Sequence, residues 1–283
     1  MSVRNNEERL GAAPNQDSPA ISNNIQDPLN FSVPTMHVDL PSKGQYYDEG
    51  HPLHNQDSIE IRFMTAKDED ILSSPNLIKK GIVLDRLVQS LILDKRLKIN
   101  SLLTGDKNAI LIQARISGYG NWYQASVTCP KCNEEQSEEF DLNECTHLKE
   151  SEKEFEESEQ VKDLGEGLFS ITLPATKVEC VIKLLTGHEE KILVKDITKK
   201  NSKEDKFATQ QLKLMLVSAN GNSEPRVVNY FSENMPISDS RFLRYVYEKV
   251  NPNAYLRTNF ECQSCGFDED LEVPLTSDFF WPK

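Results

Sequence analysis

Cysteines are the residues of this sequence with the clearest capacity for chemistry. Four of the six form two Cys-x-x-Cys pairs, namely Cys129, Cys132, Cys262 and Cys265. An alternating apolar and polar segment, typical of a strand, precedes and follows each pair. Asn133 and Gly266, which come directly after the pairs, both tolerate a positive φ. The pattern predicts two β-hairpins whose tips each point two sulfur atoms at one metal ion.

Two such tips facing one another would form a tetrahedral site with four cysteine ligands and Zn–S distances of about 2.3 Å. We therefore predict one structural Zn²⁺ per chain, held in a split zinc-ribbon-like site by two zinc knuckles. The 129 residues from 133 to 261 separate the pairs, so the metal would clamp segments that are remote in the sequence. Four protein sulfurs leave no position for water, which argues against a catalytic zinc.

Redox chemistry and disulfide bonds are the alternatives for these cysteines. A redox dithiol of the thioredoxin type would open a helix after a strand, and neither pair does so. The sequence lacks a visible export signal, which disfavours a disulfide framework. A structural metal site is the hypothesis that the matched surroundings of the two pairs favour.

The remaining cysteines and the histidines form no convincing catalytic group. Cys145 lies two residues before His147 in a strongly acidic stretch, whereas Cys180 lies in an apolar strand and is expected to be a small buried hydrophobe. Pro52 separates His51 from His54 and opposes a helix that would bring the two rings together. The sequence around His188 does not complete a zinc-protease motif. We therefore expect a protein without enzymatic activity.

Charge is distributed unevenly along the 283 residues. The formal net charge is −13, of which residues 133–166 carry −11, so the rest of the chain is nearly neutral. An acidic chain of this kind is not expected to bind nucleic acid by neutralising phosphates. No apolar run approaches the ~18 residues of a membrane span, and the first residues lack the apolar core of a secretory signal. We expect a soluble protein that is not exported.

Alternating segments and segments of helical period are mixed along the chain, which predicts an α+β fold. Six parts are expected: a flexible N-terminal arm (1–36), an α+β unit (37–120), the first knuckle hairpin (121–142), an acidic loop or helix (143–166), an inserted α+β unit (167–255), and the second knuckle hairpin with an aromatic tail (256–283). Within them, Thr65 with Asp68 is expected to cap a helix, further helices are expected near 187–199 and 205–218, and Asp239 is expected to cap a later one.

The two ends of the chain are candidate interface elements. Residues 1–36 are rich in Asn, Ser and Pro, and form either a floppy tail or an arm that becomes ordered along a partner. Phe279, Phe280 and Trp281 lie near the C-terminus. These aromatic residues either anchor the tail on the chain's own body or insert into a neighbouring subunit, because large aromatics commonly provide interface hot spots.

Several motifs taken in order resemble a known family. They are Leu40-Pro41-Ser42-Lys43-Gly44 with Tyr46-Tyr47, Phe63-Met64-Thr65-Ala66, Asp70-Ile71-Leu72, Asp85, Leu102-Leu103-Thr104-Gly105-Asp106, Ala114 to Gly120, the two cysteine hairpins, and the ending Pro274 to Pro282. This sequence is similar to the baseplate hub and assembly proteins of T-even-type contractile-tailed bacteriophages. The resemblance is strongest in 40–132 and 260–282, and it leaves out the acidic middle and the N-terminal tail.

The resemblance implies a non-enzymatic protein of the phage virion, made in the host cytoplasm. Such a protein would sit in the tail baseplate as a hub or wedge-hub junction component and contact other baseplate and tail proteins. The two predicted zinc knuckles also fit the pattern of this family. A transient assembly chaperone that is absent from the mature virion is the alternative, since the acidic segment could shield a basic or sticky surface on a partner.

Overall fold

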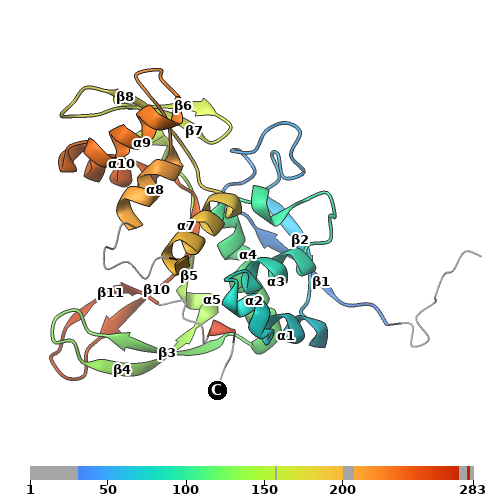
Figure 1. Ribbon diagram of the computed structural model, residues 1–283. Coiled ribbons are helices and arrows are strands. Elements are labelled where there is room, and N and C mark those ends of the chain that lie inside the picture. Colours follow the sequence, from blue (N-terminus) through green and yellow to red (C-terminus); the bar gives the residue numbers. More distant parts are fainter. Residues whose placement is uncertain (1–30, 157, 200–206, 274–278, 281–283) are drawn as a thin grey trace, which may run out of the picture. The chain divides into compact units, whose positions relative to one another are not determined.

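The computed structural model describes residues 31–156, 158–199, 207–273 and 279–280. Contacts between residues divide the chain into two units, 1–32 and 33–283, and the second unit is described below. It combines four small antiparallel sheets with helices, which agrees with the predicted α+β class (Figure 1). No helix in the described ranges has both the length and the apolar character needed to cross a bilayer.

The first part of the unit is a strand pair followed by helices. Val38 in one strand pairs with Ile59 in the other, and both side chains are buried because alternate residues face the core. The elements are β1 (Thr35–Asp39), β2 (Ser58–Arg62), α1 (Ala66–Leu72), α2 (Pro75–Lys79), α3 (Val83–Leu91), η2 (Ile99–Ser101) and α4 (Thr104–Tyr119). The mixture of strands and helices expected for residues 37–120 is therefore present.

A capping box begins α1, as the sequence predicted. The Asp68 carboxylate accepts hydrogen bonds from the backbone N–H and hydroxyl of Thr65, at 2.8 and 2.9 Å. The same carboxylate accepts from both Arg62 terminal nitrogens, at 2.6 and 2.8 Å, and from Ser90. Burial acts to raise the pKa of Asp68, but these donors outweigh burial and hold the pKa well below its usual value. Asp68 thus joins β2, α1 and α3.

Helix α4 lies at the centre of the unit and packs against the long strand β10 (Asn253–Glu261). A side chain at Gly105 would collide with the backbone carbonyl of Pro252, so the close approach requires glycine. One turn from the end of α4, Arg115 is almost fully buried, with 2% of its surface exposed. Its guanidinium donates to three backbone carbonyls, those of Phe279 (2.6 Å), Gly120 (2.6 Å) and Trp122 (3.0 Å).

The aromatic residues near the C-terminus pack on the chain's own body. Phe279 and Phe280 are buried, and the Phe279 ring meets the Tyr123 ring edge-on with centroids 5.1 Å apart. The Arg115 guanidinium lies 6.0 Å from the centre of the Phe279 ring. For Phe279 and Phe280, the structure therefore agrees with the alternative in which the tail anchors on the chain's own body. Their rings are buried and do not insert into a neighbouring subunit. Trp281 and residues 1–30 lie outside the described residues.

A four-stranded sheet in the order β6-β7-β8-β9 forms the other large part of the unit, beside α8, α9 and α10 (Figure 1). Its core-facing residues include Phe169, Ile171, Cys180 and Ile182, all with no exposed surface. The elements are β6 (Val161–Gly165), β7 (Leu168–Thr172), β8 (Glu179–Lys183), α7 (Gly187–Lys199), α8 (Phe207–Met215), β9 (Leu216–Ala219), α9 (Pro225–Asn234) and α10 (Ile237–Val250).

Three sequence-based expectations for this part were wrong. Residues 143–166 are not one acidic loop or helix: they contain the strands β5 (Thr146–Lys149) and β6 as well as the short helix α6 (Lys153–Glu156). Helix α8 ends at Met215, and the residues after it form β9, which pairs with β8. Asp239 does not cap α10, because its carboxylate accepts from the backbone of Ala175 and Thr176 in the turn before β8.

Glu189, in the first turn of α7, provides a test of pH dependence. Its carboxylate accepts from the backbone N–H and hydroxyl of Thr186, at 3.0 and 2.6 Å, and from Lys183 at 2.7 Å. Burial acts to raise the pKa of Glu189, but these donors outweigh it and lower the pKa from 4.5 to about 2. A carboxyl whose pKa is lower in the folded than in the unfolded chain stabilises the fold above the unfolded value. That contribution is lost as the pH falls towards 2.

Glu189→Gln is therefore expected to lower the free energy of unfolding by about 2 kcal/mol at pH 7, after allowance for partial solvent screening. The difference from the wild type should shrink steadily between pH 5 and pH 2. Urea unfolding at a series of pH values measures it, with Glu224→Gln as a control because Glu224 is exposed and makes no side-chain cap. A difference that stays constant over this range would contradict the assignment.

Candidate metal centre

Two antiparallel hairpins position the four paired cysteines. The first joins β3 (Trp122–Thr128) to β4 (Glu135–Asp141), and the second joins β10 to β11 (Asp268–Glu272). Alternation along β3 buries Tyr123, Ala125 and Val127 and exposes the residues between them, which fixes the face that the hairpin presents to the core. β10 also pairs with β5, so the second hairpin extends into a three-stranded sheet.

Both hairpin tips have the same backbone geometry. At the first tip the Cys129 N–H donates to the carbonyl of Glu134 (2.8 Å), and the Asn133 N–H donates to the carbonyl of Cys129 (2.9 Å). At the second tip the Cys262 N–H donates to Phe267 (2.7 Å), and the Gly266 N–H donates to Cys262 (2.9 Å). Asn133 and Gly266 have φ angles of 59° and 64°. The positive φ expected at these two positions is confirmed.

The four sulfur atoms converge at one place, although the two hairpins are remote in sequence. Cys129 Sγ lies 3.7 Å from Cys265 Sγ, and Cys132 Sγ lies 3.7 Å from Cys262 Sγ. All four sulfurs lie within 4.8 Å of one another, and no other group of this kind occurs among the described residues. A disulfide needs sulfurs about 2.05 Å apart, and all six cysteines are free thiols.

These sulfur positions fit a tetrahedral metal ion. Four sulfurs held about 2.3 Å from a central ion stand about 3.8 Å apart, which is close to the 3.7 Å that separates the sulfurs of each cross-hairpin pair. Thiolates are soft ligands that favour zinc, copper(I) or iron over calcium and magnesium. The four cysteines could therefore hold a metal ion of this class.

Charge at the cluster also favours a cation. Burial acts to raise the pKa of the Cys129 thiol, but hydrogen bonds from the backbone N–H groups of Cys132 and Lys131 outweigh it and lower the pKa to about 7. At Cys132 the backbone N–H of Glu134 acts to lower the pKa. Burial and the neighbouring sulfurs outweigh that donor and raise the pKa to about 12. Four adjacent thiols cannot all ionise alone, whereas a bound cation would let them do so.

A glutamine in β4 connects the two hairpins beside the cluster. Gln136 Nε2 donates to the backbone carbonyl of Glu261 (3.1 Å), and Gln136 Oε1 accepts from the backbone N–H of Gln263 (3.2 Å). Figure 1 shows the two hairpins lying side by side. Gln136 could not be identified from the sequence, because nothing in its spacing distinguishes it from the other polar residues of β4.

The other candidate residues from the sequence lie apart from the cluster and have structural contacts. Both half-buried rings belong to the loop between β1 and β2. His51 Nε2 is 2.9 Å from Ser101 Oγ in η2, and His54 Nδ1 is 2.6 Å from the carbonyl oxygen of Tyr47 in the same loop. Cys180 is fully buried in the β6–β9 sheet, as predicted, and Cys145 is also buried.

Comparison with known protein families finds a match to a phage protein family. Residues 33–164 match the family model described as T4 bacteriophage base plate protein, a region that includes β1 to α6 and the first cysteine hairpin. No curated protein and no solved structure matches the chain. The matched region supports a structural role in the phage baseplate, with other baseplate proteins as partners. The match over residues 33–164 supports a T4-type phage baseplate protein.

Proposed function

We propose that this chain is a non-enzymatic structural subunit of a phage tail baseplate, at the hub or the wedge-hub junction, and that one zinc ion stabilises its fold. The observation that carries the zinc assignment is the convergence of Cys129, Cys132, Cys262 and Cys265 within 4.8 Å from two hairpins. The family match over residues 33–164 supports the baseplate role.

Zinc would act as a clamp between distant parts of the chain. The segment from 133 to 261 includes the whole β6–β9 sheet and the helices beside it, and both of its ends meet at the cluster. Closing so long a loop is entropically costly, and a metal that binds only the folded chain adds its binding free energy to folding. A subunit that must resist mechanical load in a contractile tail would benefit from this.

A zinc ion at this site would not be catalytic, because four sulfur ligands complete its coordination and leave no open position for water or substrate. Elemental analysis should give about one zinc per purified chain. Cys145→Ala should leave this ratio unchanged, since Cys145 lies outside the cluster. A folded protein without metal, or a zinc content that falls in Cys145→Ala, would contradict the assignment.

An assembly chaperone that leaves before the virion is complete is the alternative role. The observation that suggests this role is the acidic segment. Part of that segment, however, belongs to the folded body, because β5 pairs with β10 and the buried Val161 begins β6. Quantitative mass spectrometry of purified virions separates the two roles. We expect the chain in fixed stoichiometry with other baseplate subunits, and its absence from virions would instead identify an assembly factor.

A further inference from the structure

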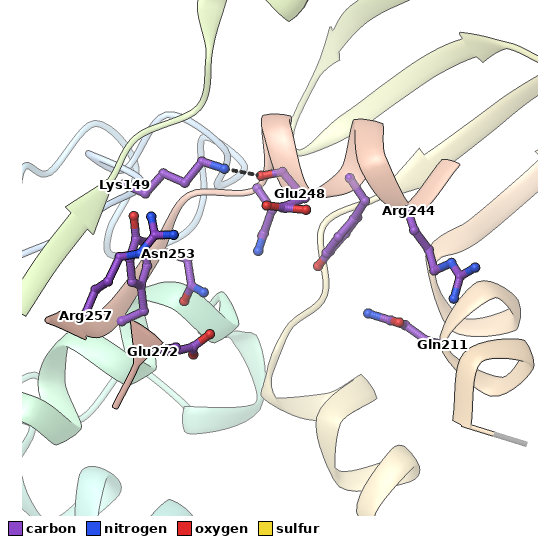
Figure 2. Close-up of a pocket in the computed structure, with 10 residues that line it drawn as sticks. Lys149, Gln211, Arg244, Glu248, Asn253, Arg257 and Glu272 are labelled. Atoms are coloured by element: carbon purple, nitrogen blue, oxygen red, sulfur yellow. Dashed lines mark hydrogen bonds between the residues drawn. The ribbon is translucent and has the colours of Figure 1, made fainter. Parts of the chain in front are cut away.

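A polar cleft of about 460 Å³ lies beside the sheet β11-β10-β5, away from the cysteine cluster (Figure 2). It is lined by Lys149, Gln211, Arg244, Tyr247, Glu248, Asn251, Asn253, Tyr255, Arg257 and Glu272. All ten of these side chains carry hydrogen-bonding or charged groups. The lining differs from that of most small-molecule pockets, which are largely apolar with only a few polar groups.

One wall of the cleft is the outer face of the sheet. Alternate residues of a strand face the same side, so Asn253, Tyr255 and Arg257 of β10 share a face, while Ala254 and Leu256 are buried on the opposite one. The strand register adds side chains from both neighbouring strands: Asn253 lies opposite Lys149 of β5, and Arg257 lies opposite Glu272 of β11. The regular pleat therefore holds this wall in place.

The second wall comes from α10 and α8. Arg244 and Glu248 are one turn apart on α10, and Gln211 comes from α8. Figure 2 shows Arg244 and Gln211 on one side of the opening, with Arg257, Asn253 and Glu272 on the other. Each wall thus carries an arginine and an amide side chain.

Three cations line this cleft, and none forms an ion pair with any residue that the structure describes. Lys149 Nζ donates to the backbone carbonyl of Glu248 (2.7 Å), a neutral acceptor, and Arg244 Nε donates weakly to the carbonyl of Ser240 (3.3 Å). Arg257 is exposed. The carboxylates of Glu248 and Glu272 also line the cleft, so its lining carries a net charge of +1.

We propose that the cleft binds an extended peptide segment of a neighbouring subunit that carries an Asp or Glu side chain between the two arginines. Guanidinium groups match carboxylates in charge and in planar, two-pronged geometry. The amides of Gln211, Asn251 and Asn253 would hydrogen-bond the backbone of that segment. The identification of the neighbour as another baseplate subunit rests on the proposed function. The binding of a carboxylate by the cleft does not depend on that function.

A nucleic acid strand is the competing anionic occupant, and the charge of the chain disfavours it. The protein carries −13 overall, and binding that depends on phosphate neutralisation needs a surplus of cations along a track. A single cleft with a net charge of +1 suits one carboxylate better than a run of phosphates. A carboxylate on a flexible segment would bind weakly alone and gain strength from contacts elsewhere in an assembly.

Titration of the full chain by NMR tests this inference. The probe is a decapeptide of alternating Glu and Gly, compared with the same peptide in which Gln replaces Glu. We expect the Glu peptide to shift the side-chain signals of Arg257, Asn251 and Asn253, and the Gln peptide to leave them unchanged. Raising the salt from about 50 to about 300 mM should weaken binding several-fold, because the contacts are charge-dependent.

Charge reversal supplies the matched comparison. Arg244→Glu with Arg257→Glu should weaken binding of the Glu peptide at least tenfold, while Arg226→Glu, at an exposed position on α9 outside the cleft, should have no effect. Thermal unfolding confirms that each variant is folded; if the double variant is not, Arg257→Glu alone serves, since Arg257 is exposed.

Equal binding of the two peptides, signal shifts confined to other surfaces, or tighter binding of a single-stranded oligonucleotide would each overturn the inference. The titration needs no baseplate, and the virion analysis does not depend on the cleft. Failure of one can therefore be distinguished from failure of the other.

Discussion

Replacement of one of the four clustered cysteines is expected to lower the free energy of unfolding by about 5 kcal/mol or more, the largest effect of any single substitution proposed for this protein. Structural zinc contributes apparent binding free energies of about 10–16 kcal/mol at pH 7 in zinc-finger peptides. Cys132→Ser and Cys265→Ser should be equally destabilising, because each would remove one ligand of the same proposed ion, although the two residues lie in different hairpins.

The shared ion also predicts that the two substitutions are not additive. Once one ligand is lost and the ion released, losing a second should cost little more, so the double variant should resemble either single one. Urea unfolding of all three variants, with and without a zinc chelator, measures this. Cys145→Ala serves as the control, because it removes a buried thiol that lies outside the cluster. Chelation should destabilise the control as much as the wild type and leave the cluster variants nearly unchanged.

A wild-type protein whose unfolding midpoint is insensitive to the chelator would contradict the clamp. So would cluster variants whose losses add, because additivity would mean that the two hairpins are stabilised independently.

Arg115→Met is expected to cost about 4 kcal/mol, the second largest effect. The methionine would fill most of the space of the buried side chain but would remove the guanidinium that donates to the carbonyls of Phe279, Gly120 and Trp122. Hydrogen bonds to a charged group contribute about 1.5–3 kcal/mol each, and a buried carbonyl left unsatisfied costs about 1–3 kcal/mol. Arg115 thus holds α4, β3 and the aromatic residues near the C-terminus in a fixed arrangement.

Arg115→Lys separates charge from geometry. A lysine keeps the positive charge but lacks the planar fork that reaches three carbonyls in different directions, so it should recover less than half of the loss. Arg226→Met, at an exposed position, should change stability by no more than about 0.5 kcal/mol. Urea unfolding compares the three, and an Arg115→Lys variant as stable as the wild type would show that charge alone matters.

Much of the fold could be predicted from the sequence where the signals are local. Strict alternation indicates β3, and Thr65 with Asp68 marks the start of α1. The cysteine hairpins were recognisable because two independent local signals agree at each tip: the Cys-x-x-Cys spacing and a following residue that adopts a positive φ. The sequence could suggest that the two tips meet, but the distances between their sulfur atoms are available only from the structure.

The missed features depend on contacts between distant residues. β5 has four residues, and its partner β10 begins about a hundred positions later, so no pattern within the acidic segment indicates a strand. The apolar run after Met215 suits a helix as well as the strand β9, and only pairing with β8 decides between them. Arg115 looks like a surface residue, because arginine is seldom fully buried, and its three acceptors become visible only in the fold.

We propose that one zinc ion joins the two cysteine hairpins. X-ray absorption at the zinc edge of the purified protein would show this ion and its ligands. We expect one zinc per chain with four sulfur ligands at about 2.3 Å and no nitrogen or oxygen ligand. A folded chain without zinc, or zinc bound by nitrogen and oxygen atoms, would contradict it.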